Sequence, residues 1–145
     1  MKSIKTWIVL ANAKTALFFV NSGPGKGLAT AGRGEQHAEP PRPYADRAGA
    51  VHSRVGPGVS AVEQSDPKNL AETEFAAALS TYLHTCFEDD AFERLIIAAS
   101  PHMLGKLRKA LPEAVAKAVV AEIDKDLTQI PIKDLPRSLQ DVIAV

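Results

Sequence analysis

The chain has 145 residues, with 17 basic and 17 acidic side chains and therefore no net charge. Its length suits a single domain spanning residues 1–145, and its hydrophobic fraction of 46% is normal for a globular protein. The balanced charge argues against a protein that wraps duplex DNA, since such proteins are basic overall. The one cysteine, Cys86, excludes an internal disulfide and gives no metal-ligand spacing, so we expect no metal site and no cofactor.

The amino terminus does not have the pattern of a targeting signal. Lys2 and Lys5 precede an apolar run at residues 7–11, but Asn12 and Lys14 interrupt that run before it is long enough for secretion. No later stretch approaches the roughly 20 apolar residues of a membrane span. We therefore expect a cytoplasmic protein without a membrane span.

The first structural signal is a pair of short apolar runs. Residues 7–11 and 17–20 are rich in aromatic and β-branched side chains, which predicts a β-hairpin inside a sheet. Residues 28–31 add a short third strand to this prediction.

The composition changes from residue 22 to residue 65. This segment holds eight of the nine glycines and five of the ten prolines. Such a segment buries too little apolar surface to offset the entropy of ordering, which predicts a long flexible loop. One interpretation is a solvated loop, and the other is an arm that orders on an anionic partner such as RNA. Its arginines would make those contacts: Arg33, Arg42, Arg47 and Arg54.

Regular structure resumes at Asp66, which with Pro67 is typical of a helix start. Apolar residues at helical spacing predict a helix over residues 67–86 that packs across one face of the sheet. An acidic turn follows, and the unbroken apolar run at residues 95–99 is typical of a central strand. Ser100, as an N-cap before Pro101, predicts the next helix, which ends near residue 111.

The carboxyl-terminal third is predicted as a short helix to about residue 117, a strand to about residue 124 and a helix over residues 137–144. The predicted fold class is α/β. A single mixed β-sheet has an N-terminal β-hairpin and helices packed on it, with the long Gly/Pro-rich loop between the hairpin and the first helix. Five residues are expected to be buried in the sheet: Leu10, Phe18, Ile96, Ile97 and Val120.

Polar side chains follow two of the predicted strands. If the strand ending near residue 124 lies parallel beside residues 95–99, then His102 and the charged residues 124–128 meet at one edge of the sheet. Ligands usually bind at this edge in α/β proteins. His102, Lys125 and Asp126 are therefore the candidate catalytic residues of a small hydrolase acting on a phosphorylated or acyl substrate. The alternative is that Lys125 and the aspartates satisfy one another and the nearby backbone.

Four motifs in the right order resemble the bacterial host-attachment proteins, which are described as required for attachment to host cells. They are the hairpin at residues 7–19, the Asp46-Arg47 pair, the strand-turn-helix at residues 92–111 and the string Lys125-Asp-Leu-Thr128. The resemblance implies an α/β domain similar to the middle domain of eukaryotic and archaeal peptide-release factors. It also implies work with RNA or the ribosome. The residues of these motifs that we expect to contact such a partner are Asp46, Ser100, Arg108 and Thr128.

The chain also departs from these relatives. Release factors have Gly-Gly-Gln in a loop after the hairpin, and the nearest string here is Gly34-Glu35-Gln36. The resemblance therefore does not extend to peptidyl-tRNA hydrolysis by that route. Two hypotheses follow. The first is a non-enzymatic host-attachment family protein that acts through an anionic partner, and the second is the small hydrolase at the sheet edge.

Overall fold

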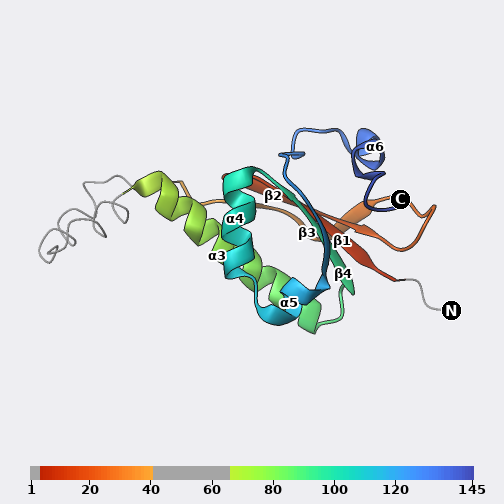
Figure 1. Cartoon of the computed structure of the whole chain (residues 1–145), viewed down its shortest axis with the longest axis horizontal. Coiled ribbons are helices and arrows are strands. Elements are labelled where there is room, and N and C mark those ends of the chain that lie inside the picture. Colours follow the sequence, from red (N-terminus) through yellow and green to blue (C-terminus); the bar gives the residue numbers. More distant parts are fainter. Residues whose placement is uncertain (1–3, 41–65) are drawn as a thin grey trace, which may run out of the picture.

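The computed structural model describes residues 4–40 and 66–145. Five strands of this part of the chain form one mixed sheet, as predicted, in the order β3-β2-β1-β4-β5 (Figure 1). The strands are β1 (Thr6–Ala11), β2 (Thr15–Asn21), β3 (Ala29–His37), β4 (Arg94–Ala99) and β5 (Val119–Ile123). β1, β2 and β3 are antiparallel neighbours, whereas β4 and β5 run parallel to β1.

Helices cover the two faces of this sheet unequally. One face carries three helices and the other carries only a short helical segment near the carboxyl terminus (Figure 1). The helices of the first face are α3 (Pro67–Glu88), α4 (Pro101–Ala110) and α5 (Glu113–Ala118). The second face is covered by η2 (Ile132–Asp134) and α6 (Leu135–Leu139).

The central strand β1 is buried along its whole length because it has a strand on each side and cover on both faces. Its alternate residues Trp7 and Val9 pack with α3, where Phe75 and Leu79 are buried, so α3 packs on one face of the sheet as predicted. Asp66 caps α3, since its carboxylate accepts from the backbone N–H groups of the first turn.

The other residues of β1 form a second, smaller cluster. Ile8 and Leu10 pack with Ile96 of β4 and with Leu135 and Leu139 of the carboxyl-terminal segment. These burials confirm the expected positions of four of the five predicted core residues: Leu10, Phe18, Ile96 and Ile97.

The prediction that the fifth residue, Val120, is buried is wrong. Val120 is 55% exposed. The register between β4 and β5 shifts between Leu95 and Ile96, which pair with Val119 and Ala121, so Val120 is an extra residue in a β-bulge. Because β5 is an edge strand, the bulge can turn this side chain away from the core.

The prediction of a long flexible loop over residues 22–65, with only a short strand in it, is wrong for its first part. β3 runs from Ala29 to His37, well beyond the short strand expected at 28–31. A register irregularity opposite Phe18 accommodates the string around Gly32, whose φ of 55° favours glycine. Ladder hydrogen bonds to β2 therefore order residues whose glycine-rich composition had predicted a flexible loop. The remainder of the predicted loop, from residue 41 to 65, lies outside the described residues.

The last helix differs from the predicted span of 137–144. α6 begins earlier, at Leu135, and ends at Leu139. Pro136 lies in its first turn, where the missing N–H costs nothing, so the proline fits the start of this helix rather than preceding it. The residues after α6 return along the sheet, with Val142 37% exposed.

Candidate functional site

The carboxyl ends of three parallel strands meet at one edge of the sheet. β1, β4 and β5 end at Ala11, Ala99 and Ile123, and the backbone N–H of Ser100 donates to the carbonyl of Ala11 at 3.2 Å. The parallel arrangement of β4 and β5 on which the predicted site depended is thus present. We call this region, with the segments that follow each strand, the carboxyl edge.

Asn12 joins the hairpin turn to the segment after β5. Its Oδ1 accepts from the backbone N–H groups of Lys14 and Thr15 at 2.8 and 2.9 Å. Its Nδ2 donates to Asp126 Oδ2 at 3.0 Å and to Thr128 Oγ1 at 3.1 Å. Asn12 was not among the residues predicted for the site. The sequence feature that could have identified it is its position directly after a buried strand.

Asp126 is held from several sides. Its Oδ1 accepts from the backbone N–H of Thr128 at 2.9 Å and from the Thr128 hydroxyl at 2.6 Å. Partial burial raises the pKa of Asp126, but the hydrogen bonds from Thr128 and Asn12 together outweigh it and hold the pKa below its usual value. Asp126 is therefore a charged carboxylate that is held in place by hydrogen bonds and orders this edge. Because its pKa is lowered, it is a weaker base than an ordinary aspartate.

The start of α4 presents groups without partners. Ser100 occupies the N-cap position, as predicted, but its side chain makes no capping hydrogen bond. His102 is exposed in the first turn, and no hydrogen bond joins its ring to any residue that the structure describes. Lys125 is likewise exposed. His102 and Lys125 both follow strands that end at this edge, but His102 belongs to α4 on one face, whereas Lys125 lies beside Ser138 of α6 on the other. No described contact pairs His102 with a carboxylate.

Two predicted binding arginines are engaged within the fold. The Arg33 guanidinium lies 3.7 Å from the centre of the Tyr82 ring, and the Arg33 backbone N–H donates to the Tyr82 hydroxyl at 2.8 Å. Arg108 donates to Glu122 at 2.6 and 2.8 Å, which raises the pKa of its guanidinium. Both arginines tie a helix to a strand. Four other predicted binding residues lie outside the described residues: Arg42, Asp46, Arg47 and Arg54.

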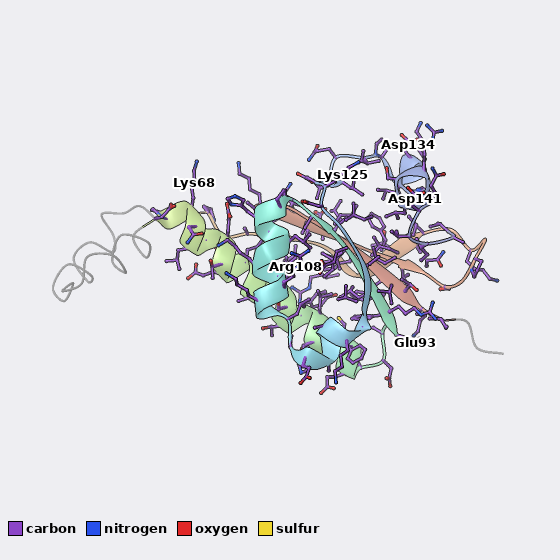
Figure 2. All side chains as sticks on the ribbon, viewed as in Figure 1. Lys68, Glu93, Arg108, Lys125, Asp134 and Asp141 are labelled. Atoms are coloured by element: carbon purple, nitrogen blue, oxygen red, sulfur yellow. The ribbon has the colours of Figure 1, made fainter. Side chains whose placement is uncertain are left out.

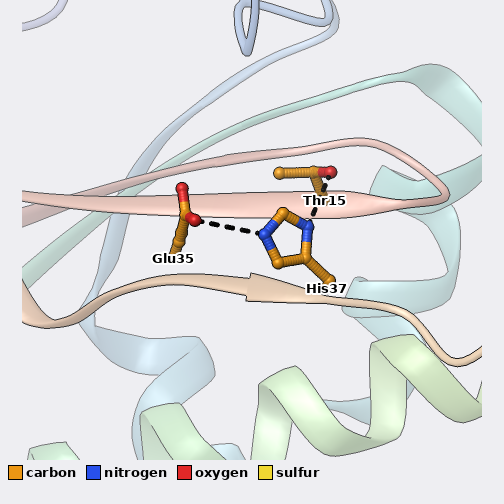
Figure 3. A network of polar contacts seen from close by, with 3 residues as sticks. All are labelled: Thr15, Glu35 and His37. Atoms are coloured by element: carbon orange, nitrogen blue, oxygen red, sulfur yellow. Dashed lines mark hydrogen bonds and ion pairs between the residues drawn. The ribbon is translucent and has the colours of Figure 1, made fainter.

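A groove of about 600 Å³ adjoins the carboxyl edge between the hairpin turn, the end of β3 and the first turns of α3. The imidazole of His37 lines it and contacts the Thr15 hydroxyl at 3.3 Å and the Glu35 carboxylate at 3.2 Å (Figure 3). The order of hydroxyl, imidazole and carboxylate is that of an activated nucleophile. Here, however, the His37 and Glu35 side chains are 62% and 61% exposed, so water screens the pair.

Two lysines, Lys14 and Lys68, line this groove, and Lys125 lies in the segment after β5. The side chains of Lys14, Lys68 and Lys125 make no hydrogen bond or ion pair with any residue within 4–40 or 66–145. Figure 2 shows Lys68 and Lys125 toward the upper side of the molecule, whereas Glu93, near the start of β4, lies toward the lower side. Acidic residues share the region, so it offers separate cations and not a continuous basic surface.

The string Gly34-Glu35-Gln36 lies within β3. Gln36 pairs with Ala16 across the ladder and accepts from the Arg33 guanidinium at 3.0 Å. It is thus part of a strand and does not present a glutamine at a loop tip. In the described ranges, no three His, Cys, Asp or Glu side chains gather closely enough to hold a metal ion. No helix of the described part is both long and apolar enough to cross a membrane.

A mixed sheet with helices on both faces and polar segments at its carboxyl edge defines an α/β protein of one five-stranded sheet. Residues 5–139 match the bacterial archaeo-eukaryotic release factor family 12, and the chain belongs to this family. No curated protein matches the chain. The match confirms the release-factor resemblance. The host-attachment name is no part of the matched description and stays a prediction.

Proposed function

We propose that this protein acts in translation by binding RNA, either free or within the ribosome. The observation that carries the proposal is the family match over residues 5–139, which includes every strand and helix of the fold. A role in translation is consistent with the cytoplasmic location predicted for the protein. We also propose that residues 1–145 form one domain. The host-attachment role remains a prediction, which an attachment assay on a strain lacking the protein would test.

The carboxyl edge supports the proposal because it offers groups that suit phosphate oxygens. Lys14 and Lys125 carry ammonium groups without described partners, and the first turn of α4 has no side-chain cap. Asn12 joins the two segments that present these lysines, since its Nδ2 donates to Asp126 and its Oδ1 accepts from the backbone N–H of Lys14. An RNA backbone that crosses the edge could therefore contact several cations without rearranging the fold.

The engaged arginines change which residues we expect to bind. Arg33 stacks on Tyr82 and Arg108 pairs with Glu122, so replacing either would disturb packing as well as binding. We propose that the phosphate contacts come from the arginines at 42, 47 and 54, with the lysines of the carboxyl edge beside them. Spread cations of this kind suit a flexible RNA backbone better than one rigid ligand.

Co-sedimentation with ribosomes and with purified cellular RNA tests the proposal. We expect the unmodified protein to co-sediment, and the variant with Arg42→Gln, Arg47→Gln and Arg54→Gln to lose most of this association. A matched control replaces three exposed cations elsewhere by glutamine: Lys109, Lys133 and Arg137. Equal losses in both variants would mean that only overall charge matters, and no association of the unmodified protein would reject the proposal.

The second candidate function is a small hydrolase of a phosphorylated or acyl substrate at the same edge. The observation that favours it is the parallel pairing of β4 and β5, whose carboxyl ends precede His102 and Lys125 at the same edge of the sheet. If it is correct, His102→Ala and Lys125→Ala should each abolish turnover of such a substrate and leave its binding intact. An RNA-binding protein without this activity would show the same low turnover as its variants.

A further inference from the structure

A second groove, of about 650 Å³, lies at the opposite end of the sheet from the candidate site. It includes Thr6 and Arg94, the first residues of β1 and β4, and its walls come from the β2–β3 turn, β5 and the residues after α6. We call it the amino-end groove. It lies on the face that only η2 and α6 cover, and α6 ends at Leu139 without reaching across it.

Exposed apolar side chains gather in this groove. Of the large apolar side chains that the structure describes, four are exposed: Ile4 (40%), Val120 (55%), Ile132 (48%) and Val142 (37%). Three of the four, all except Ile132, line the groove. Single exposed apolar residues are ordinary, but a cluster is typical of an interaction surface.

Arg94 gives the groove a charge preference. It is the only charged residue among those that line the groove. Its guanidinium makes no hydrogen bond or ion pair with any residue within 4–40 or 66–145, since only its backbone N–H donates, to the carbonyl of Lys5 at 3.3 Å. An unpaired cation beside apolar side chains complements a ligand that carries a carboxylate next to apolar groups.

The shape of the groove favours a segment of protein over a small molecule. A small-molecule site encloses most of its ligand, whereas this groove is partly open to solvent and formed by separate chain segments. The bulge at Val120 interrupts the outer edge of β5, which disfavours a partner that adds a further strand. A partner would therefore rest on the side chains.

We propose that the amino-end groove docks an apolar segment of a partner protein that carries a carboxylate paired with Arg94. Ile4, Val120 and Val142 supply the apolar contact, and Arg94 sets the preference for acidic over basic partners. This surface lies at the far end of the sheet from the carboxyl edge, so the protein could hold RNA and a protein partner together.

Two synthetic amphipathic peptides test the proposal, one built from leucine and glutamate and the other from leucine and lysine. Fluorescence polarisation should show the full-length protein binding the glutamate peptide about tenfold more tightly than the lysine peptide. Arg94→Glu should reverse this preference, and Val120→Asp should weaken both complexes. Arg137→Glu and Ile132→Asp are matched controls outside the groove, and both should bind as the unmodified protein does.

Three results would overturn the proposal. The first is that neither peptide binds, and the second is that Arg94→Glu leaves the preference unchanged. The third is a dimer in analytical ultracentrifugation that Val120→Asp dissociates, since the occupant would then be a second copy of this chain. Because Val120 and Arg94 are exposed, the variants should fold, which circular dichroism spectra would verify.

Discussion

Gly32 is the residue at which the backbone and the core depend most directly on each other. A Cβ atom at this position would collide with the Tyr82 hydroxyl and lie 2.8 Å from Trp7 Cη2. The absence of a side chain at Gly32 lets β3 approach α3, so that the next backbone N–H reaches the Tyr82 hydroxyl. Gly32 thus has a packing role in addition to its positive φ of 55°.

Replacement of Gly32 separates these two roles. We expect Gly32→Ala to lower the free energy of unfolding by more than about 2 kcal/mol, because strain from a positive φ and overpacking add together. Gly25→Ala is the matched control, since Gly25 also has a positive φ (76°) but nothing lies within 4 Å of its added Cβ. Urea denaturation compares the two. Similar losses would show that packing against Tyr82 contributes little.

Asp126 makes the stability of the carboxyl edge depend on pH. Because its folded pKa is lowered, its carboxylate contributes stability that is complete above the unfolded pKa of about 3.9 and is lost as the pH falls through the folded pKa. We expect Asp126→Asn to be destabilised relative to the unmodified protein at pH 7. This difference should shrink as the pH falls below about 4.

Urea unfolding at pH 7 and pH 3 measures this effect, with Asp141→Asn as an exposed control. A difference between Asp126→Asn and the unmodified protein that stays constant over this range would mean that the hydrogen bonds from Thr128 and Asn12 do not favour the charged carboxylate.

At the scale of the elements, α3 and the central strands hold the fold together. Leu79 of α3 and Ile97 of β4 are fully buried in the same cluster. Their truncation to alanine should each lower the free energy of unfolding by about 2–5 kcal/mol, the usual range for large core side chains. Thr81→Ala, on the exposed side of α3, is the control and should change it by less than about 0.5 kcal/mol. Thermal or urea unfolding would contradict the assignment if all three variants matched the unmodified protein.

The elements that the sequence predicts well are those in which local pattern and tertiary position agree. β1 and β4 are continuous apolar runs with cover on both faces, and α3 begins with Asp66 and Pro67. β3 was predicted too short because its glycines disfavour a strand, while the ladder to β2 overrides that preference. The exposure of Val120 depends on a bulge at the sheet edge, which no periodicity in the sequence indicates.

The candidate site was predictable only in part, because some of its contacts depend on tertiary packing and not on local sequence pattern. Residues that follow parallel strands can be placed at one edge from topology alone, which is how His102 and Lys125 were selected. The engagement of Arg33 with Tyr82 joins positions 49 residues apart, and that of Arg108 with Glu122 joins positions on two elements. Such contacts arise from packing. The composition of the loop had assigned Arg33 to a binding surface, and the family resemblance had assigned Arg108.

At the scale of the whole molecule, the sheet has two unlike ends. The carboxyl edge carries Lys14 and Lys125, which have no partner among the described residues. In the amino-end groove, Arg94 is the one charged residue of the lining, and it lies beside three exposed apolar side chains. Membership of a release-factor family and the carboxyl edge together motivate the proposed RNA contact. An RNA-binding surface has an affinity that depends on salt concentration, because each phosphate contact releases counterions.

The most direct test of the proposed function is therefore the salt dependence of RNA binding. The logarithm of the association constant for single-stranded RNA should fall linearly with the logarithm of the salt concentration. Replacing the arginines at 42, 47 and 54 by glutamine should flatten that line by about 0.7 for each lost contact, or about 2 for all three. A slope that is unchanged in this variant, or RNA binding that does not vary with salt, would contradict the account.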